Sequence, residues 1–535
     1  MNEASSNQVD SSGPVAPPGS LAEYVGYYSQ LKPEAEAVVF GSHRITYSQL
    51  RKDVDRYAQA LLACGFKKGD RVAMLCTPRP EFWTVFLAAT HIGLTWVGLN
   101  PGYRRDELRH IVSDCQPKMI FSLAQIEGRE YSDDLSALMA EFPSVEELVA
   151  IDGAISGAAP LGDFLSRSED ITDSYYRSAS LSVNIQDAAL LVYTSGTTGK
   201  PKGALISNLG LTRGATMQAT HFTVKNPQVV VNFPINHVAC VADTCATTLV
   251  KGGKIVFQER FEPGTTLQAI QNEKCTLMAG VPTMLQMMLD QPGFNQYDLS
   301  SVECIVWGGA AMPKDGIARL RKICPRLLSV YGLTESSANI VFNNEGDSLD
   351  ALAESIGKPD TSVECRIVDD AGNLCTQGST GELQFRADFF FLGYWNQPEA
   401  SNDAFSEDGW LKTGDIGFLR DDGNLELVGR KSEMFKSGGE NVYPREIEII
   451  LESLPEVAMA AVIGMPDDVF QEVGHAFVIL EPGQQITADE LRTLCKKRLA
   501  NYKVPKKFEV RPSLPVLPVG KIDKQTLKQE ALAKN

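Results

Sequence analysis

Positive charge is scarce in this chain of 535 residues, which has 50 lysines and arginines against 67 aspartates and glutamates and a formal net charge of −17. General binding of nucleic acid requires a basic surface, so no nucleic-acid partner is expected. Local clusters of lysine can still hold a small anionic ligand.

Long apolar runs are also missing. A membrane-spanning helix needs roughly 18 or more consecutive apolar residues, and no such run occurs, so no membrane span is expected. Residues 1–20 are polar and rich in Ser, Pro and Gly, without the basic and apolar regions of a secretory signal. We expect them to be a disordered lead-in.

Paired cysteine motifs are absent. The chain has 11 cysteines, an odd number, and none forms a Cys-x-x-Cys pair. Reduced, buried cysteines in a cytoplasmic protein are the natural interpretation. Cys240 and Cys245 lie close together, but only His237 is nearby, so packing is expected there and not a zinc site.

What the chain does have is a loop rich in glycine, hydroxyl and lysine. The apolar run 188–193 predicts a buried strand, and residues 194–203 follow it as Thr-Ser-Gly-Thr-Thr-Gly-Lys-Pro-Lys-Gly. Backbone N–H groups, hydroxyls and lysines together suit phosphate oxygens. Gly196 and Gly199 are too close for a Walker loop, and Pro201 follows the first lysine. The prediction is a nucleotide-phosphate loop of another kind.

Strands and helices alternate on both sides of this loop. A helix is predicted from a capping box at 46–49, with apolar residues at helical spacing and Gly65 as its end. Strands are predicted at 71–76, 95–99, 118–122, 228–234, 254–257, 277–282, and from 304 and 327, with helices between them. The pattern indicates an α/β fold with helix-covered, mostly parallel sheets. Residues 124–185 are too irregular to assign.

From about Ile356 the pattern changes to short alternating segments, at 363–368, 381–386, 416–420 and 425–428. Residues 369–373 and 421–424 are typical of hairpin turns. We expect a small antiparallel or β-barrel-like subdomain, a linker at 429–432 and then a small α+β domain. The expected domains are a large one at 21–430 and a small C-terminal one at 431–535.

Four further constellations carry charge at turns or strand ends. Glu335, at the end of the strand from 327, is suited to the Mg²⁺ that accompanies nucleotide phosphates. Asp415, beside a glycine, is suited to ribose hydroxyls, and Arg430 is a permanent cation. Lys521 lies on a tight turn near the C-terminus. Each signal alone is weak, and their joint order is what carries the prediction.

That order resembles the adenylate-forming superfamily of acyl-CoA synthetases, luciferases and peptide-synthetase adenylation domains. The resemblance covers residues 21–532 and lies in five motifs in the expected order, at 193–203, 331–335, 413–415, 429–436 and 520–524. It implies two steps. A carboxylate attacks the α-phosphate of ATP to give an acyl-adenylate and pyrophosphate, and a thiol, usually that of coenzyme A, then displaces AMP.

The resemblance also implies roles for individual residues. Lys521, Lys202 and Glu335 are the implied catalytic residues, with Lys521 between the carboxylate and the α-phosphate, and Glu335 and Thr198 on Mg²⁺. The implied phosphate ligands also include Thr194, Ser195, Gly196 and Thr197. Ribose and adenine are implied to contact Asp415, Arg430, Gly309, Ala310, Ala311, Tyr331, Gly332 and Thr334.

In this family the small domain is a mobile lid that rotates between the two steps. The hinge position, usually Asp or Lys, is Ser432 here, with Lys431 before it. The segment 437–444 resembles the one that shapes the pantetheine tunnel, which implies contacts of coenzyme A with Lys436, Gly438 and Gly439.

The acid pocket is expected to be apolar with one aromatic wall. Its implied residues are His237, Val238, Ala239, Val281, Trp307, Gly308 and Leu333. We expect a hydrophobic medium-chain, aryl or polycyclic acid. Asp243 could contact a polar substituent, but a structural or solvated role is at least as probable on sequence alone.

Other functions are less consistent with the motifs. A peptide-synthetase domain would have Asp after Phe233, where this chain has Pro234, and no sequence for a carrier domain follows Asn535. We therefore expect a free-standing CoA ligase, and the sequence leaves a homodimer open. The alternative is an acyl-AMP ligase that loads a separate carrier protein. A P-loop kinase fails on spacing, and an inactive ATP sensor would have lost the charged residues that are present here.

Overall fold

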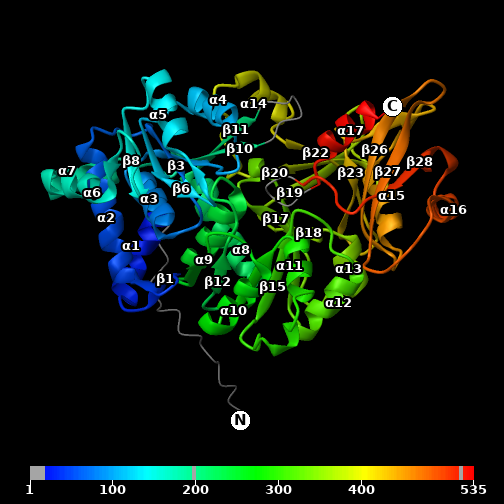
Figure 1. Ribbon diagram of the computed structural model, residues 1–535, viewed down its shortest axis with the longest axis horizontal. Helices are drawn as coiled ribbons and strands as arrows, with labels where there is room; N and C mark the ends of the chain where they lie inside the picture. Colours follow the sequence, from blue (N-terminus) through cyan, green and yellow to red (C-terminus); the bar gives the residue numbers. More distant parts are fainter. Residues whose placement is uncertain (1–18, 195–200, 517–521, 535) are drawn as a thin grey trace, which may run out of the picture.

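Two large sheets hold most of the strands of this protein, shown as a ribbon in Figure 1. The computed structural model describes residues 19–194, 201–516 and 522–534. The first sheet has the strand order β21-β11-β10-β4-β3-β5-β8-β9, and its pairs are parallel except those that β11 makes. Its strands are β21 (Gly393–Tyr394), β11 (Lys202–Ser207), β10 (Ala188–Thr194), β4 (Thr95–Leu99), β3 (Arg71–Leu75), β5 (Met119–Leu123), β8 (Glu147–Asp152) and β9 (Ala159–Pro160).

The second sheet has the order β18-β17-β16-β15-β14-β12-β13-β1-β2. Its central pairs, from β16 to β1, are parallel, and its outer pairs are antiparallel. Its strands are β18 (Lys358–Pro359), β17 (Asn339–Phe342), β16 (Leu327–Gly332), β15 (Cys304–Gly308), β14 (Leu277–Gly280), β12 (Gln228–Val231), β13 (Lys254–Phe257), β1 (Glu36–Phe40) and β2 (His43–Thr46). The predicted fold class, with mostly parallel sheets, is confirmed.

Helices cover these sheets as expected, and α3 joins the two. The helices of this part are α1 (Leu21–Leu31), α2 (Tyr47–Ala63), α3 (Pro80–His91), α4 (Arg105–Cys115), α5 (Ser132–Glu141), α6 (Leu161–Ser166), α7 (Asp173–Leu181), α8 (Asn208–Phe222), α9 (Thr247–Val250), α10 (Pro263–Glu273), α11 (Pro282–Leu289), α12 (Lys314–Ile323), α13 (Leu349–Glu354) and α14 (Pro398–Ala404). Phe82 on α3 packs 5.5 Å from the Trp96 ring of one sheet and 5.8 Å from the Phe257 ring of the other. A largely buried helix rich in aromatic residues therefore packs between the two sheets.

The predicted cap of α2 is half formed. The Thr46 hydroxyl accepts a hydrogen bond from the Gln49 backbone N–H at 3.2 Å. The Gln49 side chain, however, donates to Asp53 at 2.7 Å instead of reaching back to the cap residue. The helix ends as predicted at Gly65, which adopts φ +77°.

A third sheet follows, and it corrects the predicted linker. Its strands β19 (Glu364–Val368), β20 (Gly381–Arg386), β22 (Leu411–Leu419) and β23 (Leu425–Arg430) pair antiparallel in that order, as an open sheet and not a closed barrel. Gly429 and Arg430, predicted as linker, belong to β23, because the Arg430 guanidinium pairs with Asp415 across the ladder. The connecting segment begins at Lys431.

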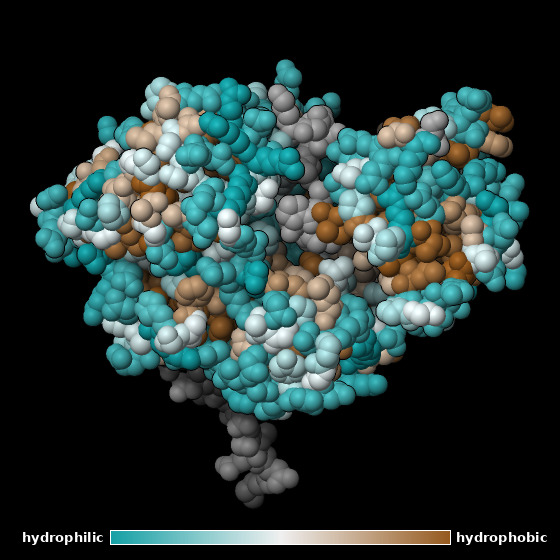
Figure 2. All heavy atoms as spheres, viewed as in Figure 1, coloured by the Kyte–Doolittle hydropathy of each residue, from teal (hydrophilic) through white to brown (hydrophobic). Residues whose placement is uncertain are grey.

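The C-terminal part has its own sheet, with helices on both faces (Figure 1). Its elements are β24 (Phe435–Ser437), β25 (Glu440–Val442), α15 (Pro444–Glu452), β26 (Val457–Asp467), β27 (Gln471–Leu480), α16 (Ala488–Arg498), β28 (Lys507–Val510) and α17 (Lys524–Ala533). Val462 of β26 packs in one core with α15 and α16, whereas its neighbour Ile463 packs in another with α17. This alternation is what a strand buried on both faces requires. The surface is hollowed between this part and the larger body (Figure 2).

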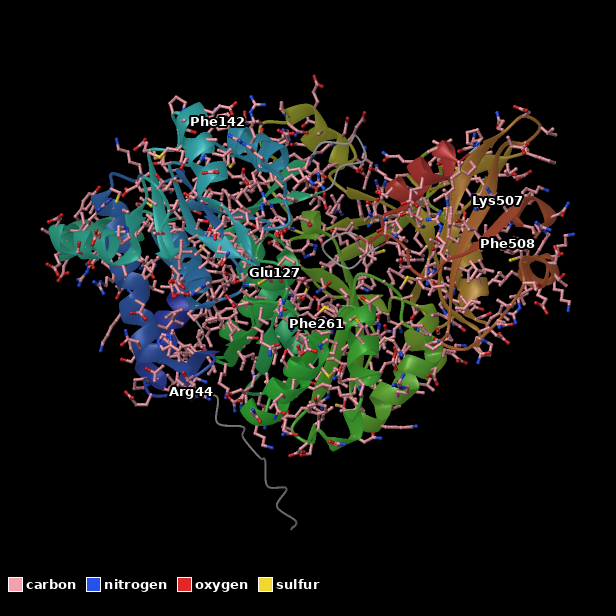
Figure 3. The ribbon with its side chains drawn as sticks, in the orientation of Figure 1. Arg44, Glu127, Phe142, Phe261, Lys507 and Phe508 are labelled. Atoms are coloured by element: carbon pink, nitrogen blue, oxygen red, sulfur yellow. The ribbon has the colours of Figure 1, made fainter. Side chains whose placement is uncertain are left out.

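Charged side chains surround the outer strand β2. The Arg44 guanidinium, labelled in Figure 3, donates to the Glu273 carboxylate at 2.7 Å. Lys254 of β13 bridges Glu273, at the end of α10, and Glu36 of β1, at 3.1 and 3.3 Å. Among the described residues, no helix is long and apolar enough to cross a membrane.

We predict that Lys524 holds the C-terminal part together. Its ammonium pairs with Glu433 and, at 2.8 Å, with Glu448, whose side chain is only 4% exposed. The change Lys524→Met leaves the buried Glu448 with Arg445, at 3.5 Å, as its remaining cation, and we expect the free energy of unfolding to fall by about 1–3 kcal/mol. Urea denaturation, with hydrogen exchange to localise the loss to α15, β26 and α17, measures this. The control Lys528→Met breaks a more exposed pair with Glu472. Equal losses in the two variants would contradict the prediction.

Candidate active site

The predicted phosphate loop leaves and enters the sheet on adjacent strands. Thr194 ends β10, Lys202 begins β11, and the two residues pair across the antiparallel ladder. Ser195, Gly196, Thr197 and Thr198 lie outside the described residues. The side chains of Thr194 and Lys202 are both partly exposed, so the two residues that flank the loop are accessible to solvent where β10 ends and β11 begins.

Tyr394 connects Lys202 to Glu335. The Lys202 ammonium lies 5.2 Å from the centre of the Tyr394 ring, and the Tyr394 hydroxyl donates to Glu335 Oε1 at 2.6 Å. Burial, together with the charge of Glu335, raises the pKa of Tyr394, so its hydroxyl remains a donor. Sequence reasoning missed this tyrosine, because the two-residue strand β21 that carries it is too short to give an alternating pattern.

Among the described residues, Glu335 Oε1 has a hydrogen-bond partner and Oε2 has none. Glu335 lies in a short 3₁₀ turn directly after β16, and its backbone carbonyl accepts from the Phe391 N–H at 3.0 Å. The backbone and Oε1 are thus both fixed. A single oriented carboxylate is what Mg²⁺ requires when substrate phosphates supply the other ligands, so the residues present fit the expected ion. The described residues contain no group of three or more His, Cys, Asp or Glu side chains that could hold a metal alone.

Asp415 is the most constrained carboxylate of the site. The Tyr331 hydroxyl, at the end of β16, donates to Asp415 Oδ2 at 2.6 Å, and Arg430 Nε donates to Oδ1 at 2.9 Å. The Asp415 side chain is 4% exposed, whereas that of Arg430 is 51% exposed. Asp415 holds the pKa of Arg430 above its usual range, and burial together with Asp415 raises that of Tyr331. Two sheets are therefore tied together by one buried carboxylate.

The ends of β15 and β16 have no room for side chains. A Cβ atom on Gly332 would lie 2.4 Å from the Ala338 carbonyl oxygen, and one on Gly308 would lie 2.9 Å from Val330 Cγ2. The backbone is consequently bare at these strand ends. The predicted adenine contacts Gly309, Ala310 and Ala311 form an exposed turn next to them, and Thr334 is partly exposed.

The predicted acid pocket is only partly brought together. His237, Ala239, Val281, Gly308 and Leu333 are all partly exposed near the ends of the second sheet's strands or in the segment after β12. His237 Nδ1 accepts from the Ala239 N–H at 3.1 Å, which leaves the ring proton on Nε2.

Trp307 differs from its predicted place as an open aromatic wall. It is 1% exposed and packs in the core of the second sheet with residues of α11 and α12, while Val238 is also buried. The side chains of successive strand residues point to opposite faces, and Trp307 points to the helix-covered one.

The segment after His237 is a π-helix, η2 (Ala239–Ala246), which the sequence did not predict. Cys240 and Cys245 are buried in it, and burial raises the pKa of the Cys245 thiol, in keeping with the predicted packing role. All 11 cysteines are free.

The C-terminal predictions lie apart from these residues or outside the described ones. Lys521 is outside. Lys436 is exposed on β24, and Gly438 and Gly439 are exposed on the turn between β24 and β25, with φ +62° and +89°. Among the described residues, no hydrogen bond or ion pair joins these three to Asp415, Tyr331 or Glu335.

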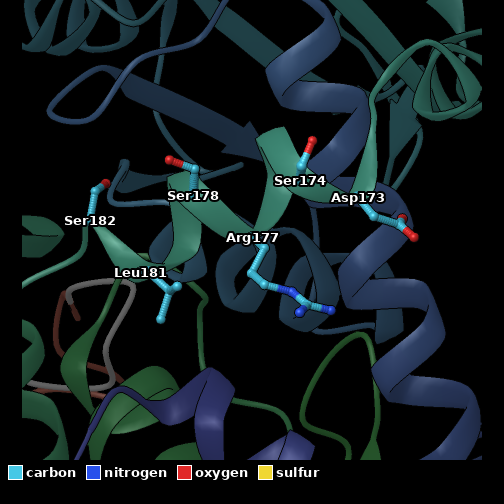
Figure 4. A pocket seen from close by; sticks show the side chains of 6 residues that line it. All are labelled: Asp173, Ser174, Arg177, Ser178, Leu181 and Ser182. Carbon is cyan, nitrogen blue, oxygen red and sulfur yellow. The ribbon is translucent and has the colours of Figure 1, made fainter.

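A surface hollow on α7 does not belong to the site. Figure 4 shows its lining, which comes from one helix and the residue after it: Asp173, Ser174, Arg177, Ser178, Leu181 and Ser182. None of the residues predicted for nucleotide or acid lines it.

Comparison with known families agrees with this arrangement. A family model described as AMP-binding enzyme matches residues 28–395, well over half of the chain. The chain belongs to this family. A second model, AMP-binding enzyme C-terminal domain, matches residues 446–521.

Named relatives of this chain include acyl-CoA ligases and synthases. The chain is 32% identical over 495 residues to a feruloyl-CoA synthase from Amycolatopsis sp, covering 92% of this chain and 95% of that protein. It is 30% identical over 530 residues to the mitochondrial medium-chain acyl-CoA ligase ACSF2 of Bos taurus, covering 94% and 86%. The protein is therefore an enzyme of the AMP-forming acid–CoA ligase family.

A solved structure supports the same placement. ATP-bound MatB from Rhodopseudomonas palustris superposes with a TM-score of 0.84 at 25% identity, covering 96% of this chain and 99% of that one. The adenylate-forming family and its ATP binding are thus confirmed. The roles of the individual residues remain predictions.

We predict that the hydroxyl of Tyr331 stabilises the site. The change Tyr331→Phe leaves one oxygen of the buried Asp415 without a donor, and we expect the free energy of unfolding to fall by about 1.5–3 kcal/mol. Tyr175→Phe is the matched control, because that residue is 51% exposed on α7. Urea unfolding midpoints with unchanged slopes would measure both. A Tyr331→Phe midpoint equal to that of the control would contradict the prediction.

Proposed function

We propose that the protein joins a hydrophobic carboxylic acid to coenzyme A at the expense of ATP. In the first step a carboxylate oxygen bonds to the α-phosphorus of ATP and the bond to pyrophosphate breaks. In the second step the thiol sulfur of coenzyme A bonds to the acyl carbon, AMP leaves, and the thiol proton passes to solvent. No side chain needs to form a covalent intermediate.

The observation that carries this proposal is the grouping of charged residues around the end of β16. Tyr331 holds Asp415 and Arg430, and four residues further along the chain Glu335 is held by Tyr394 beside Lys202. Glu335 also raises the pKa of Arg430, so the two pairs of residues are close enough to interact electrostatically. An anion-binding face next to an oriented carboxylate suits a nucleoside triphosphate and its metal.

Each group has a distinct part in the proposed first step. Asp415, fixed by two donors, accepts from ribose hydroxyls, and Arg430 is exposed enough to reach the α-phosphate. Lys202 and the loop 194–200 hold the terminal phosphates. Mg²⁺, when bound, neutralises phosphate charge, and Glu335 together with Thr198 would hold it.

Two anions must approach each other in this step, and Lys521 is the residue proposed to lie between them. It belongs to the C-terminal unit, which we propose extends from residue 431 to 535 and turns about the segment at Lys431 and Ser432. Both residues are exposed, directly after β23. The hairpin of β24 and β25, which carries Lys436, Gly438 and Gly439, would then approach the body and admit the pantetheine arm.

The acid itself is proposed to be hydrophobic, medium-chain or aromatic. Support comes from the apolar side chains of the partly exposed Ala239, Val281 and Leu333, and from relatives named for medium-chain and aryl acids. Apolar pockets discriminate weakly, by about 1–3 kcal/mol per methylene, so a small family of acids is expected.

We predict that pyrophosphate release depends on a hydrophobic acid and on Lys521. The assay measures pyrophosphate, AMP and thioester for a panel of aliphatic and aryl acids, with and without coenzyme A. Lys521→Ala should lower adenylation by at least about 100-fold, because it removes a charge that acts on the transition state. Lys528→Ala, on the exposed face of α17, is the control and should leave the rate unchanged.

The outcomes separate the alternatives. Pyrophosphate and AMP with thioester support the proposal. Pyrophosphate release without thioester would favour an acyl-AMP ligase that loads a carrier protein, and formation of ADP would contradict adenylation altogether.

We also predict that Tyr394 tunes the magnesium requirement. Tyr394→Phe removes the hydrogen bond that orients Glu335, and loss of such an orienting partner typically weakens metal binding by about 10–100-fold. The Mg²⁺ concentration for half-maximal pyrophosphate release should rise by about tenfold, and further for Glu335→Gln. An unchanged Mg²⁺ requirement in Tyr394→Phe would contradict the orienting role of Tyr394, and an unchanged requirement in Glu335→Gln would remove Glu335 from the proposed metal site.

A further inference from the structure

Helix α4 ends against the strand that leads into the predicted phosphate loop (Figure 1). Near the end of this helix, Asp114 Oδ2 accepts a hydrogen bond from the Tyr193 hydroxyl at 2.6 Å. Tyr193 is 5% exposed and directly precedes Thr194, the last residue of β10 and the first of the loop. A helix outside the loop therefore holds the strand from which the loop leaves.

A carboxylate is an unfavourable residue beside a phosphate-binding loop. Negative charge opposes the binding of a triphosphate, so an acid in this place needs a contact that offsets the repulsion. Among the described residues, the Tyr193 hydroxyl is the one side-chain group that donates a hydrogen bond to the Asp114 carboxylate. What Asp114 contributes here is then an accepting oxygen and not a charge.

The Tyr193 hydroxyl is held as a donor. Burial raises the pKa of Tyr193, and the neighbouring Cys115 and Asp114 raise it further. The phenol therefore stays protonated at neutral pH and donates to the carboxylate. The ring also packs closely on the next strand, because a Cβ atom on Gly203 of β11 would lie 3.1 Å from Tyr193 Cζ. Little space is left for the ring to take another position.

The same face of α4 contacts the chain where the loop returns to the sheet. His110 lies one helical turn before Asp114, and residues four positions apart share a face of a helix. His110 Nε2 donates to the Pro201 carbonyl at 3.4 Å. Pro201 directly precedes Lys202, the first residue of β11. One face of α4 thus contacts both flanks of the predicted loop.

The main chain of Asp114 anchors a third segment. Its carbonyl oxygen accepts from Trp395 Nε1 at 3.0 Å and from the Asn396 amide at 3.2 Å. Asn396 has φ +53°, a left-handed conformation that asparagine adopts more readily than most residues. Tyr394, the residue before this pair, donates to the proposed metal ligand Glu335. The end of α4 is therefore fixed to the segment that orients that carboxylate.

We propose that Asp114 is a positioning residue for the terminal phosphates of ATP, acting through Tyr193. It fixes the tyrosine, and thereby the end of β10, so that the chain enters the loop in one geometry. This inference rests on the proposed function, in which the loop 194–200 holds those phosphates, and adds a residue outside the loop. Donors that are ordered in advance bind a charged group better than donors that binding must order.

The test compares the binding of MgATP with that of AMP by isothermal titration calorimetry. AMP has the adenosine and the α-phosphate but lacks the phosphates that the loop is proposed to hold. The enzymes are the wild type, Asp114→Ala, Asp114→Asn, Tyr193→Phe, and the double variant that combines Asp114→Ala with Tyr193→Phe. Asp106→Ala is the matched control, because Asp106 is exposed in the first turn of the same helix.

Asp114→Ala and Tyr193→Phe should each raise the Kd of MgATP by about tenfold, because a displaced loop loses its alignment with the phosphates. The Kd of AMP should not change, which also shows that the variants are folded. The double variant should bind MgATP no more weakly than either single variant, since both changes remove the same interaction. Asp106→Ala should bind both nucleotides as the wild type does.

Asp114→Asn separates position from charge. Its amide oxygen can still accept from Tyr193, and one negative charge is removed from the neighbourhood of the triphosphate. The Kd of MgATP should therefore equal that of the wild type or fall below it. If Asp114 acted through its charge alone, Asp114→Ala and Asp114→Asn would both bind MgATP more tightly.

Three results would overturn the inference. The first is an Asp114→Ala variant that binds MgATP as tightly as the wild type, or more tightly. The second is additive weakening by Asp114→Ala and Tyr193→Phe, which would mean that the two residues do not act through their hydrogen bond. The third is equal weakening of MgATP and AMP, which would show a general structural role.

Failure of the proposed function is measured separately. Binding of MgATP requires no acid, so an acid panel without pyrophosphate release would refute the ligase and leave the nucleotide comparison valid. If Asp114→Ala does not fold, the comparison of Tyr193→Phe with Asp114→Asn still decides, because one change removes the hydrogen bond and the other keeps it. Equal MgATP affinity in those two variants and the wild type would overturn the inference.

Discussion

Negative charge is the constraint on which the site depends. The chain carries a net charge of −17, yet its family binds ATP, and the proposed reaction brings a second anion to the α-phosphate. The local field must therefore be built from a few cations at chosen places. Arg430 and Lys202 are held there by an ion pair and a ring contact respectively. The carboxylates nearby are restrained by tyrosine hydroxyls, which orient them without adding charge.

This arrangement also explains how three sheets contribute to one site. Tyr331 comes from the second large sheet, Asp415 and Arg430 from the small antiparallel sheet, and Lys202 from the first large sheet. Each group stands at the end of a strand or on a strand held by its neighbours. Positions of this kind keep a side chain in place with little freedom. Displacement of one sheet relative to another would separate the charges that must act together.

Much of the fold was predictable, because the local signals and the packing agree. Apolar runs that end in glycine or charge predicted the parallel strands, and turn-rich alternation predicted the antiparallel sheet. The linker was misplaced because the glycine in Gly429-Arg430 suggested a break, whereas the ion pair with Asp415 continues the strand. The pairing of β23 with β22 determines where the strand ends, and the local sequence around Gly429 does not reveal that pairing.

Residues of the candidate site that belong to a sequence motif could be predicted. A residue that contacts them only in the folded structure could not. Asp415, Glu335 and Lys202 followed from their motifs. Tyr394 did not, because its role comes from the pairing of β21 with β11, nearly two hundred positions apart in sequence. Trp307 was misjudged because an aromatic residue near a strand end can face either side of the sheet.

The margins of the two large sheets have a consequence for the protein at high concentration. Unpaired strand edges invite other chains to add strands and aggregate. Within the described residues, the outermost strands β9, β18 and β21 have only two residues each, and two of them contain a proline, Pro160 or Pro359, that cannot donate a hydrogen bond. The fourth, β2, carries Arg44 in its ion pair with Glu273. At each outer strand, an added strand would meet too few backbone groups to pair with, a proline without an N–H, or a charged side chain. These large sheets therefore resist edge-to-edge association.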